Sequence, residues 1–398
     1  MRTRCCRVLV AGTVIVLVMP SALASDCEQT SVGFVPLNDL GSGLYLDEFE
    51  GGLYPNGSNM PPLPHFIEGV IRAGALMPLD PQGEFSETGS IVLLSIGMSN
   101  TTQEFCSQGG GEPCTPWSFM GQASTHPLVD DTHLAIANGA LSGQSAATWD
   151  EPADENYDRV RDDVLAPMGL SEAQVQVVWV KQANEMPAVS LPAPEADAWQ
   201  LVARLADIAR SIGVRYPNAR IIFLSSRIYA GYACSPLNPE PYAYESGFAV
   251  KWLIEAQIQQ MMTGRIDERA GDLDYTSVAP WLAWGPYMWA DGLVPRSDGL
   301  IWKCSDFEID GTHPGTAAEE KAGHMLLDFF LHSPFARPWF TDNPADLNDD
   351  GIVSFTDMLI LLSSWGPCPP PPEACEADID ENGFVGLGDL LILLSSWG

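Results

Sequence analysis

The segment Asp310-Gly311-Thr312-His313 places a carboxylate three residues before an imidazole, ahead of a stretch with helical character. A histidine that acts as a general base needs one ring nitrogen held by a carboxylate, so that the other nitrogen can take a proton from a nucleophile. The same residues are also common in turns, because Asp-Gly and His-Pro-Gly sequences favour them. The segment therefore predicts catalysis only if a nucleophile and oxyanion donors accompany it elsewhere in the chain.

Residues suited to these remaining roles lie upstream, each shortly after an apolar run. Ser99 could attack an acyl carbonyl, His313 would take its proton, and Asp310 would orient the imidazole. The backbone amides of Ser99 and Gly143, with the side-chain amide of Asn184, would stabilise the oxyanion. Together these residues predict acyl transfer through a serine nucleophile.

Short apolar runs alternate with amphipathic stretches between residues 89 and 340, as in an α/β domain. Four runs predict buried strands, at 91–96, 134–137, 175–180 and 221–224. Periodic apolar positions predict helices at 199–212, 248–262 and 317–331. We expect a three-layer α/β/α fold with a mostly parallel, flavodoxin-like sheet, and residues 25–88 as an extension packed on it. Because ligands bind at the carboxyl ends of parallel strands, the candidate residues should meet at one edge.

The sequence blocks around Ser99, Gly143, Asn184 and the Asp310–His313 pair resemble those of the SGNH, or GDSL-like, hydrolases. This superfamily of secreted esterases and lipases is matched over roughly residues 89–331. Met98 stands where the family usually has aspartate before its serine, and the block Gln-Ala-Asn-Glu replaces the usual Gly-x-Asn-Asp. The resemblance implies a secreted serine esterase that needs no cofactor for catalysis. It also implies one catalytic set, made of Ser99, Gly143, Asn184, Asp310 and His313.

Some alternatives stay open. Ser145, in Gly-Gln-Ser-Ala-Ala, is a rival nucleophile, although it lacks the second glycine of a nucleophile elbow. Aromatic residues ahead of the Asp/His pair could stack on sugar rings, and they could equally fill a core: Trp281, Trp284, Tyr287, Trp289 and Trp302. We expect an ester substrate, with an O-acyl group on a carbohydrate preferred. The alternative is a non-catalytic glycan-binding or adhesion protein docked through its tail.

Residues 1–24 have the three parts of a signal peptide, with arginines before an apolar run at 8–19 and a small-residue cleavage pattern. Beyond them remain 16 basic and 52 acidic residues, a formal charge of about −36. This charge argues against nucleic-acid and anionic-membrane partners. No later segment is apolar enough to span a bilayer. We therefore expect a secreted, periplasmic or extracellular protein.

The tail, residues 345–398, contains an internal repeat, because Leu-Ile-Leu-Leu-Ser-Ser-Trp-Gly occurs at 359–366 and again at 391–398. Each copy (346–366 and 378–398) begins with a loop whose oxygen atoms at positions one, three, five, seven and twelve suit Ca²⁺. The two predicted sets are Asp346, Asn348, Asp350, Ile352 and Asp357, then Asp378, Asp380, Asn382, Phe384 and Asp389. The tail resembles type I dockerin modules, which implies two bound calcium ions and a cohesin-like docking partner.

Seven cysteines lie beyond residue 24, and export makes disulfides plausible. Two of the expected cysteine pairs would close short loops, and a third would join two loops on the active-site side. Cys27 would then remain unpaired. The expected pairs are Cys106 with Cys114, Cys368 with Cys375, and Cys234 with Cys304.

Overall fold

The computed structural model describes residues 25–107, 113–342, 345–348, 353–369, 375–379 and 382–397. The predicted signal peptide, residues 1–24, lies outside these ranges. So do three of the predicted calcium-ligand positions, Asp350, Ile352 and Asp380.

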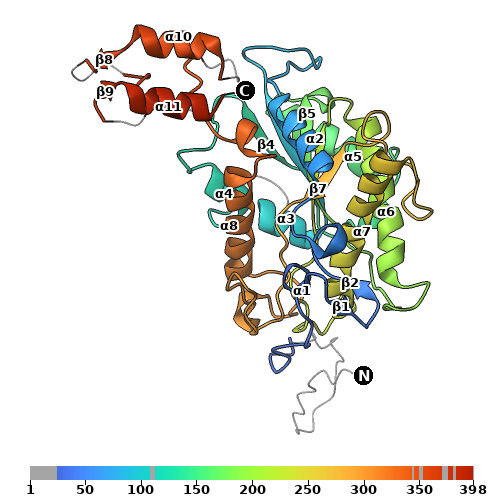
Figure 1. Ribbon diagram of the computed structural model, residues 1–398. Helices are drawn as coiled ribbons and strands as arrows, with labels where there is room; N and C mark the ends of the chain where they lie inside the picture. Colours follow the sequence, from blue (N-terminus) through green and yellow to red (C-terminus); the bar gives the residue numbers. More distant parts are fainter. Residues whose placement is uncertain are drawn as a thin grey trace, which may run out of the picture.

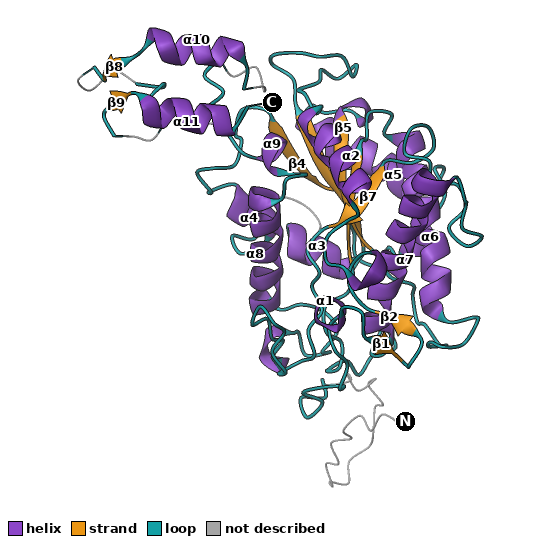
Figure 2. Ribbon diagram, viewed as in Figure 1, coloured by secondary structure: helices purple, strands orange, loops and turns teal. Residues whose placement is uncertain are grey.

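A five-stranded sheet forms the centre of the larger region, and its neighbouring strands all pair in parallel (Figure 2). The strand order is β4-β3-β5-β6-β7. The strands are β3 (Ile91–Gly97), β4 (Leu134–Asn138), β5 (Val175–Lys181), β6 (Ile221–Ser225) and β7 (Trp281–Trp284). Every residue of β3, β5, β6 and β7 is buried, as expected for strands covered on both faces. The predicted parallel α/β sheet is confirmed, with one strand more than expected.

The additional strand, β7, has the sequence Trp-Leu-Ala-Trp and pairs with β6. Aromatic residues favour strands because their side chains pack well on a pleated surface. Trp281 and Trp284 are only 0% and 3% exposed, and the other aromatic residues named above, Tyr287, Trp289 and Trp302, are also buried. Of the two roles left open for this cluster, the structure therefore supports the second, because the rings fill the core and offer no stacking faces to sugars.

Helices cover both faces of the sheet (Figure 1). On one side lie α5 (Glu155–Arg159), α6 (Asp197–Arg215) and α7 (Tyr242–Thr263), and on the other lie α3 (Ser99–Phe105), α4 (Phe119–Ala123) and α8 (Thr316–His332). The helices predicted at 199–212, 248–262 and 317–331 lie within α6, α7 and α8. In α6, Leu201, Leu205 and Ile208 are buried at spacings of three and four residues, which turns one stripe of the helix toward the core.

Residues 25–88 pack onto this region. They contain α1 (Leu37–Leu40), β1 (Leu44–Tyr45), β2 (Phe49–Glu50) and α2 (Leu63–Gly74), while the short α9 (Arg337–Phe340) follows α8. Leu37 is fully buried, and its amide donates to the Tyr287 hydroxyl. Gly69 of α2 lies so close to Trp281 that an added Cβ would come within 2.4 Å of the indole ring. A glycine at this position lets α2 approach β7.

The described residues form three disulfides, Cys27–Cys304, Cys106–Cys114 and Cys368–Cys375. The expected pair of Cys234 with Cys304 is wrong, because Cys304 bonds to Cys27 instead. The backbone explains this difference. The amide of Ser25 donates to Ile309 O at 2.6 Å, and that of Asp26 donates to Tyr232 O at 2.9 Å. The first bond brings the N-terminal segment to the loop that carries Cys304, and the second brings it to the segment that carries Cys234.

The tail has a small core of its own, separate from that of the sheet region. It contains α10 (Phe355–Ser363) and α11 (Leu387–Ser395), with a short antiparallel pair of β8 (Gly366–Pro367) and β9 (Phe384–Val385). Three pairs of buried residues, each 32 positions apart, fill this core: Ala345 and Ala377, Val353 and Val385, Leu361 and Leu393. The sequence repeat is therefore also a structural repeat. Within the described ranges of the chain, no helix is long and apolar enough to cross a bilayer.

Candidate active site

Ser99, Asp310 and His313 lie together at the carboxyl edge of the sheet. Ser99 follows β3 and is the first residue of α3, while Asp310 and His313 lie in the loop that precedes α8. His313 Nε2 lies 2.9 Å from Ser99 Oγ, and His313 Nδ1 lies 2.6 Å from Asp310 Oδ2. The structure thus brings together three residues that the sequence separates by up to 214 positions.

Hydrogen bonds fix the charge state of Asp310. Its carboxylate accepts from the Thr312 amide at 2.9 Å, from the His313 amide at 3.0 Å and from the His313 ring. Burial alone would raise the pKa of this carboxyl, but these bonds outweigh burial and lower the pKa to about 2. An ionised carboxylate can only accept, so His313 Nδ1 carries a proton and Nε2 is free to accept the Ser99 hydroxyl proton.

The loop that carries Asp310 and His313 can adopt its shape only with a glycine inside it. Gly311 has φ +66°, in the left-handed region. A Cβ at this position would also come within 2.1 Å of Tyr232 O. The Asp-Gly sequence therefore forms a turn, as one interpretation held, and the turn presents the two polar side chains to Ser99.

Other polar contacts hold this loop against the serine segment. Asn100 Nδ2 donates to Thr312 O at 3.1 Å, which ties the residue after Ser99 to the residue before His313. The hydroxyls of Ser235 and Thr312 are 2.8 Å apart. These contacts join segments that are distant in sequence, and no local signal in the sequence pointed to Asn100 or Ser235.

The predicted oxyanion residues, Gly143 and Asn184, line the same cavity as Ser99. Gly143 has φ +79°, a conformation that favours glycine. The Asn184 amide group is held from two sides, since Nδ2 donates to Asp197 Oδ1 at 2.9 Å and Oδ1 accepts from Arg204 at 2.8 Å. Burial raises the pKa of Asp197, while its contacts with Asn184 and Arg204 act in the opposite direction. Asp197 and Arg204 were not predicted from sequence.

The cavity at this edge has a volume of about 260 Å³. Its described lining includes no Phe, Tyr or Trp. Ser145, the rival nucleophile, also lines it, but the His313 ring is bonded to Ser99. In the described part of the chain, no hydrogen bond links Ser145 to a histidine. The geometry therefore favours Ser99 as the nucleophile.

The described parts of the two tail loops show how carboxylates shape them. In the first loop, Asp357 is fully buried and accepts from the amides of Leu347 at 2.8 Å and Ser354 at 2.7 Å. In the second loop, Asp378 accepts from the amides of Asn382 at 3.1 Å and Gly383 at 2.8 Å. Each loop thus folds around a predicted ligand residue.

The charges of the tail fit a bound cation. Residues 345–398 include ten acidic side chains and no Lys, Arg or His. Asp357 and Asp389, at position twelve of each loop, are both 0% exposed, and burying a carboxylate is unfavourable unless a positive charge accompanies it. Oxygen donors of this kind suit Ca²⁺. Cys368 and Cys375 lie near Asp378 but form a disulfide, so they have no thiolate to bind a metal.

No model of a known protein family matches the chain, and a comparison with curated proteins finds no match. Among solved structures, a family two carbohydrate esterase from Clostridium thermocellum is 15% identical, with 60% of this chain and 63% of that chain covered and a TM-score of 0.32. A protein from Arabidopsis thaliana is 12% identical, with 61% and 99% covered and a TM-score of 0.35. An extracellular lipase from Streptomyces rimosus is 12% identical, with 60% and 99% covered and a TM-score of 0.29. At such TM-scores, function has to be inferred from the geometry of the cavity.

Proposed function

We propose that the chain is an exported serine esterase that cleaves an ester bond, preferably an O-acyl group on a carbohydrate. One observation carries this proposal: the Ser99 hydroxyl, the His313 ring and the Asp310 carboxylate form a continuous hydrogen-bonded chain beside a cavity. This arrangement matches the roles of nucleophile, general base and orienting carboxylate.

In the first half of the reaction, Ser99 Oγ attacks the acyl carbon while His313 Nε2 takes the hydroxyl proton. Asp310 keeps the other ring nitrogen protonated and stabilises the imidazolium. The bond between the acyl carbon and the alcohol oxygen then breaks, and His313 gives its proton to the leaving alcohol. Water, activated by the same histidine, releases the acid from Ser99 in the second half.

The negative charge on the carbonyl oxygen would be stabilised by the amides of Ser99 and Gly143 and by Asn184 Nδ2. Such donors act strongly because they are already oriented before the charge develops. Asp197 and Arg204 would serve as positioning residues, since they fix the side-chain amide of Asn184.

Three observations support the finer parts of the proposal. Disulfides form in oxidising compartments, and the structure has three, which supports export. Polar side chains such as Gln103, Ser142 and Asn238 line the cavity beside apolar ones such as Met98 and Leu237, and they suit an alcohol that carries hydroxyl groups. The cavity volume of about 260 Å³ suits a short acyl chain.

Hydrolysis of 4-nitrophenyl acetate by purified variants tests this proposal. We expect Ser99→Ala to lose activity by about 10⁴-fold or more. Ser145→Ala, which removes a hydroxyl from the same cavity, is the matched control and should retain most of the activity. Equal activity of Ser99→Ala and the wild type would refute the mechanism, whereas a folded wild-type protein without activity would favour the non-catalytic, glycan-binding alternative.

We propose that the tail binds two calcium ions through the ligand set predicted from its loops. A bound Ca²⁺ would balance the acidic side chains and tie each loop to the helix that follows it. Asp357 and Asp389 would link ion and helix, because each lies in the first turn of its helix.

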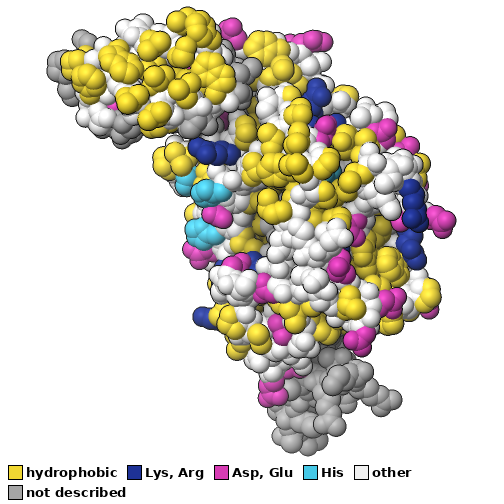
Figure 3. Space-filling view, in the orientation of Figure 1, with side chains coloured by type: hydrophobic (Ala, Val, Ile, Leu, Met, Phe, Trp, Pro, Cys, Tyr) yellow, Lys and Arg dark blue, Asp and Glu magenta, His cyan; other side chains and the backbone are white. Residues whose placement is uncertain are grey.

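The tail also presents an apolar face to solvent, which supports the proposed cohesin-like docking partner (Figure 3). Four pairs of residues, each 32 positions apart, are 44–64% exposed there: Phe355 and Leu387, Leu359 and Leu391, Leu362 and Leu394, Trp365 and Trp397. Exposed apolar patches of this kind mark interaction sites. Calorimetric titration with a cohesin module tests the partner, and an absence of binding in saturating Ca²⁺ would remove docking from the proposal.

A further inference from the structure

Arg227 is a buried cation at the active-site cavity that the mechanism does not use. It lies two residues beyond the end of β6, at the same sheet edge as Ser99, and it lines the cavity. The residue is only 2% exposed. Its Nε and Nη2 atoms have no hydrogen-bond partner among the described residues. A buried guanidinium with two unused donors is unfavourable unless another group satisfies them.

The acidic groups near Arg227 are already bonded elsewhere. Burial lowers the pKa of Arg227, and the charges of Glu104, Glu240 and Asp310 act against this effect. Lys181 donates to both oxygens of Glu104. The Glu240 carboxylate accepts from the Ala230 and Tyr244 amides and from the Trp289 ring, and that of Asp310 accepts from His313. These carboxylates stabilise the charge of Arg227 without occupying its Nε and Nη2 donors.

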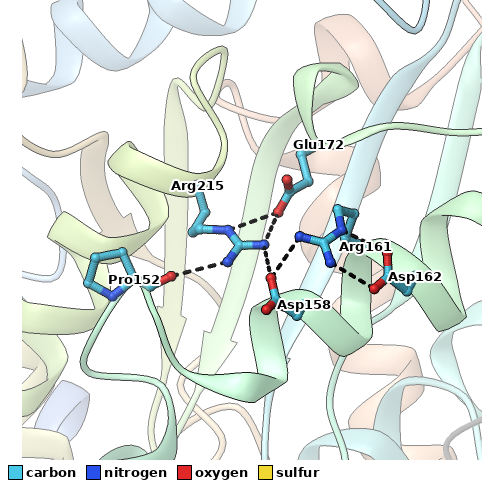
Figure 4. Close-up of polar contacts among 6 residues, drawn as sticks. All are labelled: Pro152, Asp158, Arg161, Asp162, Glu172 and Arg215. Carbon is cyan, nitrogen blue, oxygen red and sulfur yellow. Dashed lines mark hydrogen bonds and ion pairs between the residues drawn. The ribbon is translucent and has the colours of Figure 1, made fainter.

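The two unused donors form the edge of the guanidinium that binds carboxylates elsewhere in this protein. Arg161 donates from Nε and Nη2 to the two oxygens of Asp162, both at 2.7 Å (Figure 4). Arg296 donates from the same two atoms to the oxygens of Asp298, at 2.9 and 2.5 Å. Such two-pronged bonds to a carboxylate are strong and directional. Arg227 has the same edge unpaired and lines the cavity beside the proposed nucleophile, but both nitrogen atoms are buried, so a bound carboxylate would have to draw the side chain toward the cavity.

We propose that Arg227 binds a carboxylate carried by the substrate, so that the esterase prefers anionic esters. This inference rests on the proposed function. The carboxylate could belong to the acyl half, as in a half-ester of a dicarboxylic acid, or to the alcohol half, as in an O-acetylated uronic acid. Both present the same planar pair of oxygens to the guanidinium.

The acidic surface of the protein acts against this preference at long range. Its formal charge of about −36 beyond residue 24 repels an anion, but salt screens that repulsion beyond about 8 Å at physiological ionic strength. The contact with Arg227 is shielded from solvent and is screened much less. We therefore expect added salt to raise kcat/KM for an anionic ester, whereas an exposed arginine would give the opposite trend.

Two pairs of substrates test the inference in the wild-type protein. Ethyl hydrogen succinate is compared with ethyl succinamate, its neutral amide, and O-acetylated galacturonic acid is compared with O-acetylated galacturonamide. We expect kcat/KM to favour the carboxylate in one pair by about 10- to 100-fold, the range of charge-assisted hydrogen bonds. The pair that shows the preference identifies the half of the ester that carries the carboxylate. Equal values within both pairs would overturn the inference.

Variants then assign the preference to Arg227. Arg227→Lys keeps the charge but loses the two-pronged edge, so the ratio of kcat/KM for the carboxylate to kcat/KM for the amide should fall. Arg227→Gln should abolish the preference for the carboxylate. Arg161→Gln, the same substitution on an exposed arginine, is the matched control and should keep the wild-type ratio. A folded Arg227→Gln protein that still preferred the carboxylate would contradict the assignment. Failure to hydrolyse any ester would instead refute the proposed function, which separates the two claims.

Discussion

The sheet region and the tail both place carboxylates in buried or half-buried positions, but they differ in what balances the charge. In the sheet region, Asp310 is balanced by the His313 ring and by neighbouring amides. In the tail, Asp357 is fully buried in a segment that has no basic residue of its own. The difference teaches that protein groups alone can assemble the first site, whereas in the second the proposed calcium ions would supply the positive charge that the tail lacks. We therefore expect catalysis and calcium binding to be separable.

After Ser99→Ala, the largest effect expected in the sheet region comes from Asp310→Asn. The asparagine keeps the size of the side chain but no longer holds His313 in the tautomer that accepts the Ser99 proton. We expect kcat/KM for 4-nitrophenyl acetate to fall about 10⁴-fold. A fall of less than tenfold would mean that Asp310 does not orient the ring.

A smaller loss is expected from Asn184→Ala, which removes one proposed oxyanion donor. We expect kcat to fall by about 10²- to 10³-fold, with a smaller change in KM, because the lost contact forms mainly in the transition state. Asn218→Ala is the matched control, since Asn218 Nδ2 donates to Ala173 O at 2.8 Å away from the cavity. An unchanged kcat in Asn184→Ala would remove Asn184 from the oxyanion site.

In the tail, chelation with EDTA is expected to act on stability and not on hydrolysis. At a free Ca²⁺ concentration of about 100 times Kd, each proposed site would add about 2.7 kcal/mol to the free energy of unfolding. EDTA should remove this contribution. Asp357→Ala should remove the contribution of the first loop, while Glu376→Ala, an exposed acidic residue beside the second loop, should not. Circular dichroism with and without Ca²⁺ measures this effect. A spectrum and a melting curve that do not change on addition of Ca²⁺ or EDTA would contradict the proposed calcium sites.

The smallest expected effect is on the pH dependence of stability, and it comes from Glu245 in the sheet region, whose carboxylate we expect to be protonated. Burial, more than any other influence, raises the pKa of Glu245 to about 7, although its bonds from the Leu191 amide and Tyr45 hydroxyl act against burial. Because the folded-state pKa exceeds the ordinary value of 4.5, this group favours folding most below pH 4.5 and loses that contribution as pH rises toward 7.

Glu245→Gln should therefore flatten the pH dependence of Tm. Between pH 5 and pH 8, we expect the wild-type Tm to fall by about 2 °C more than that of the variant. The exposed Glu195→Gln serves as the control. Parallel Tm profiles for Glu245→Gln and the wild type would show that Glu245 does not titrate in this range.

Most of the sheet could be predicted because apolar runs such as 91–96 and 175–180 are local signals of buried strands. The strand β7 was missed because its two tryptophans also suited a sugar-binding surface, and only packing separates the two roles. Ser99 could be proposed because it follows a strand end, and His313 because it lies three residues after Asp310. The supports of the site could not, since the bond from Arg204 to Asn184 joins α6 to the segment after β5 and forms only in the folded chain.

Distance along the chain also explains the missed disulfide. The pairing of Cys27 with Cys304 joins residues 277 positions apart, and nothing near Cys27 in the sequence indicates where the N-terminal segment lies. Arg227 could not be predicted either, because an arginine after a strand is common. Its burial and unused donors become visible only in the fold.

Covalent labelling with a fluorophosphonate, in Ca²⁺ and in EDTA, tests most directly the claim that the sheet region holds a self-sufficient serine site. We predict one adduct on Ser99 of the wild-type protein, found by mass spectrometry of its peptides, with similar labelling rates in both conditions. Ser99→Ala should not be labelled. An adduct on Ser145, labelling that needs Ca²⁺, or no adduct on a protein that hydrolyses esters would contradict the account.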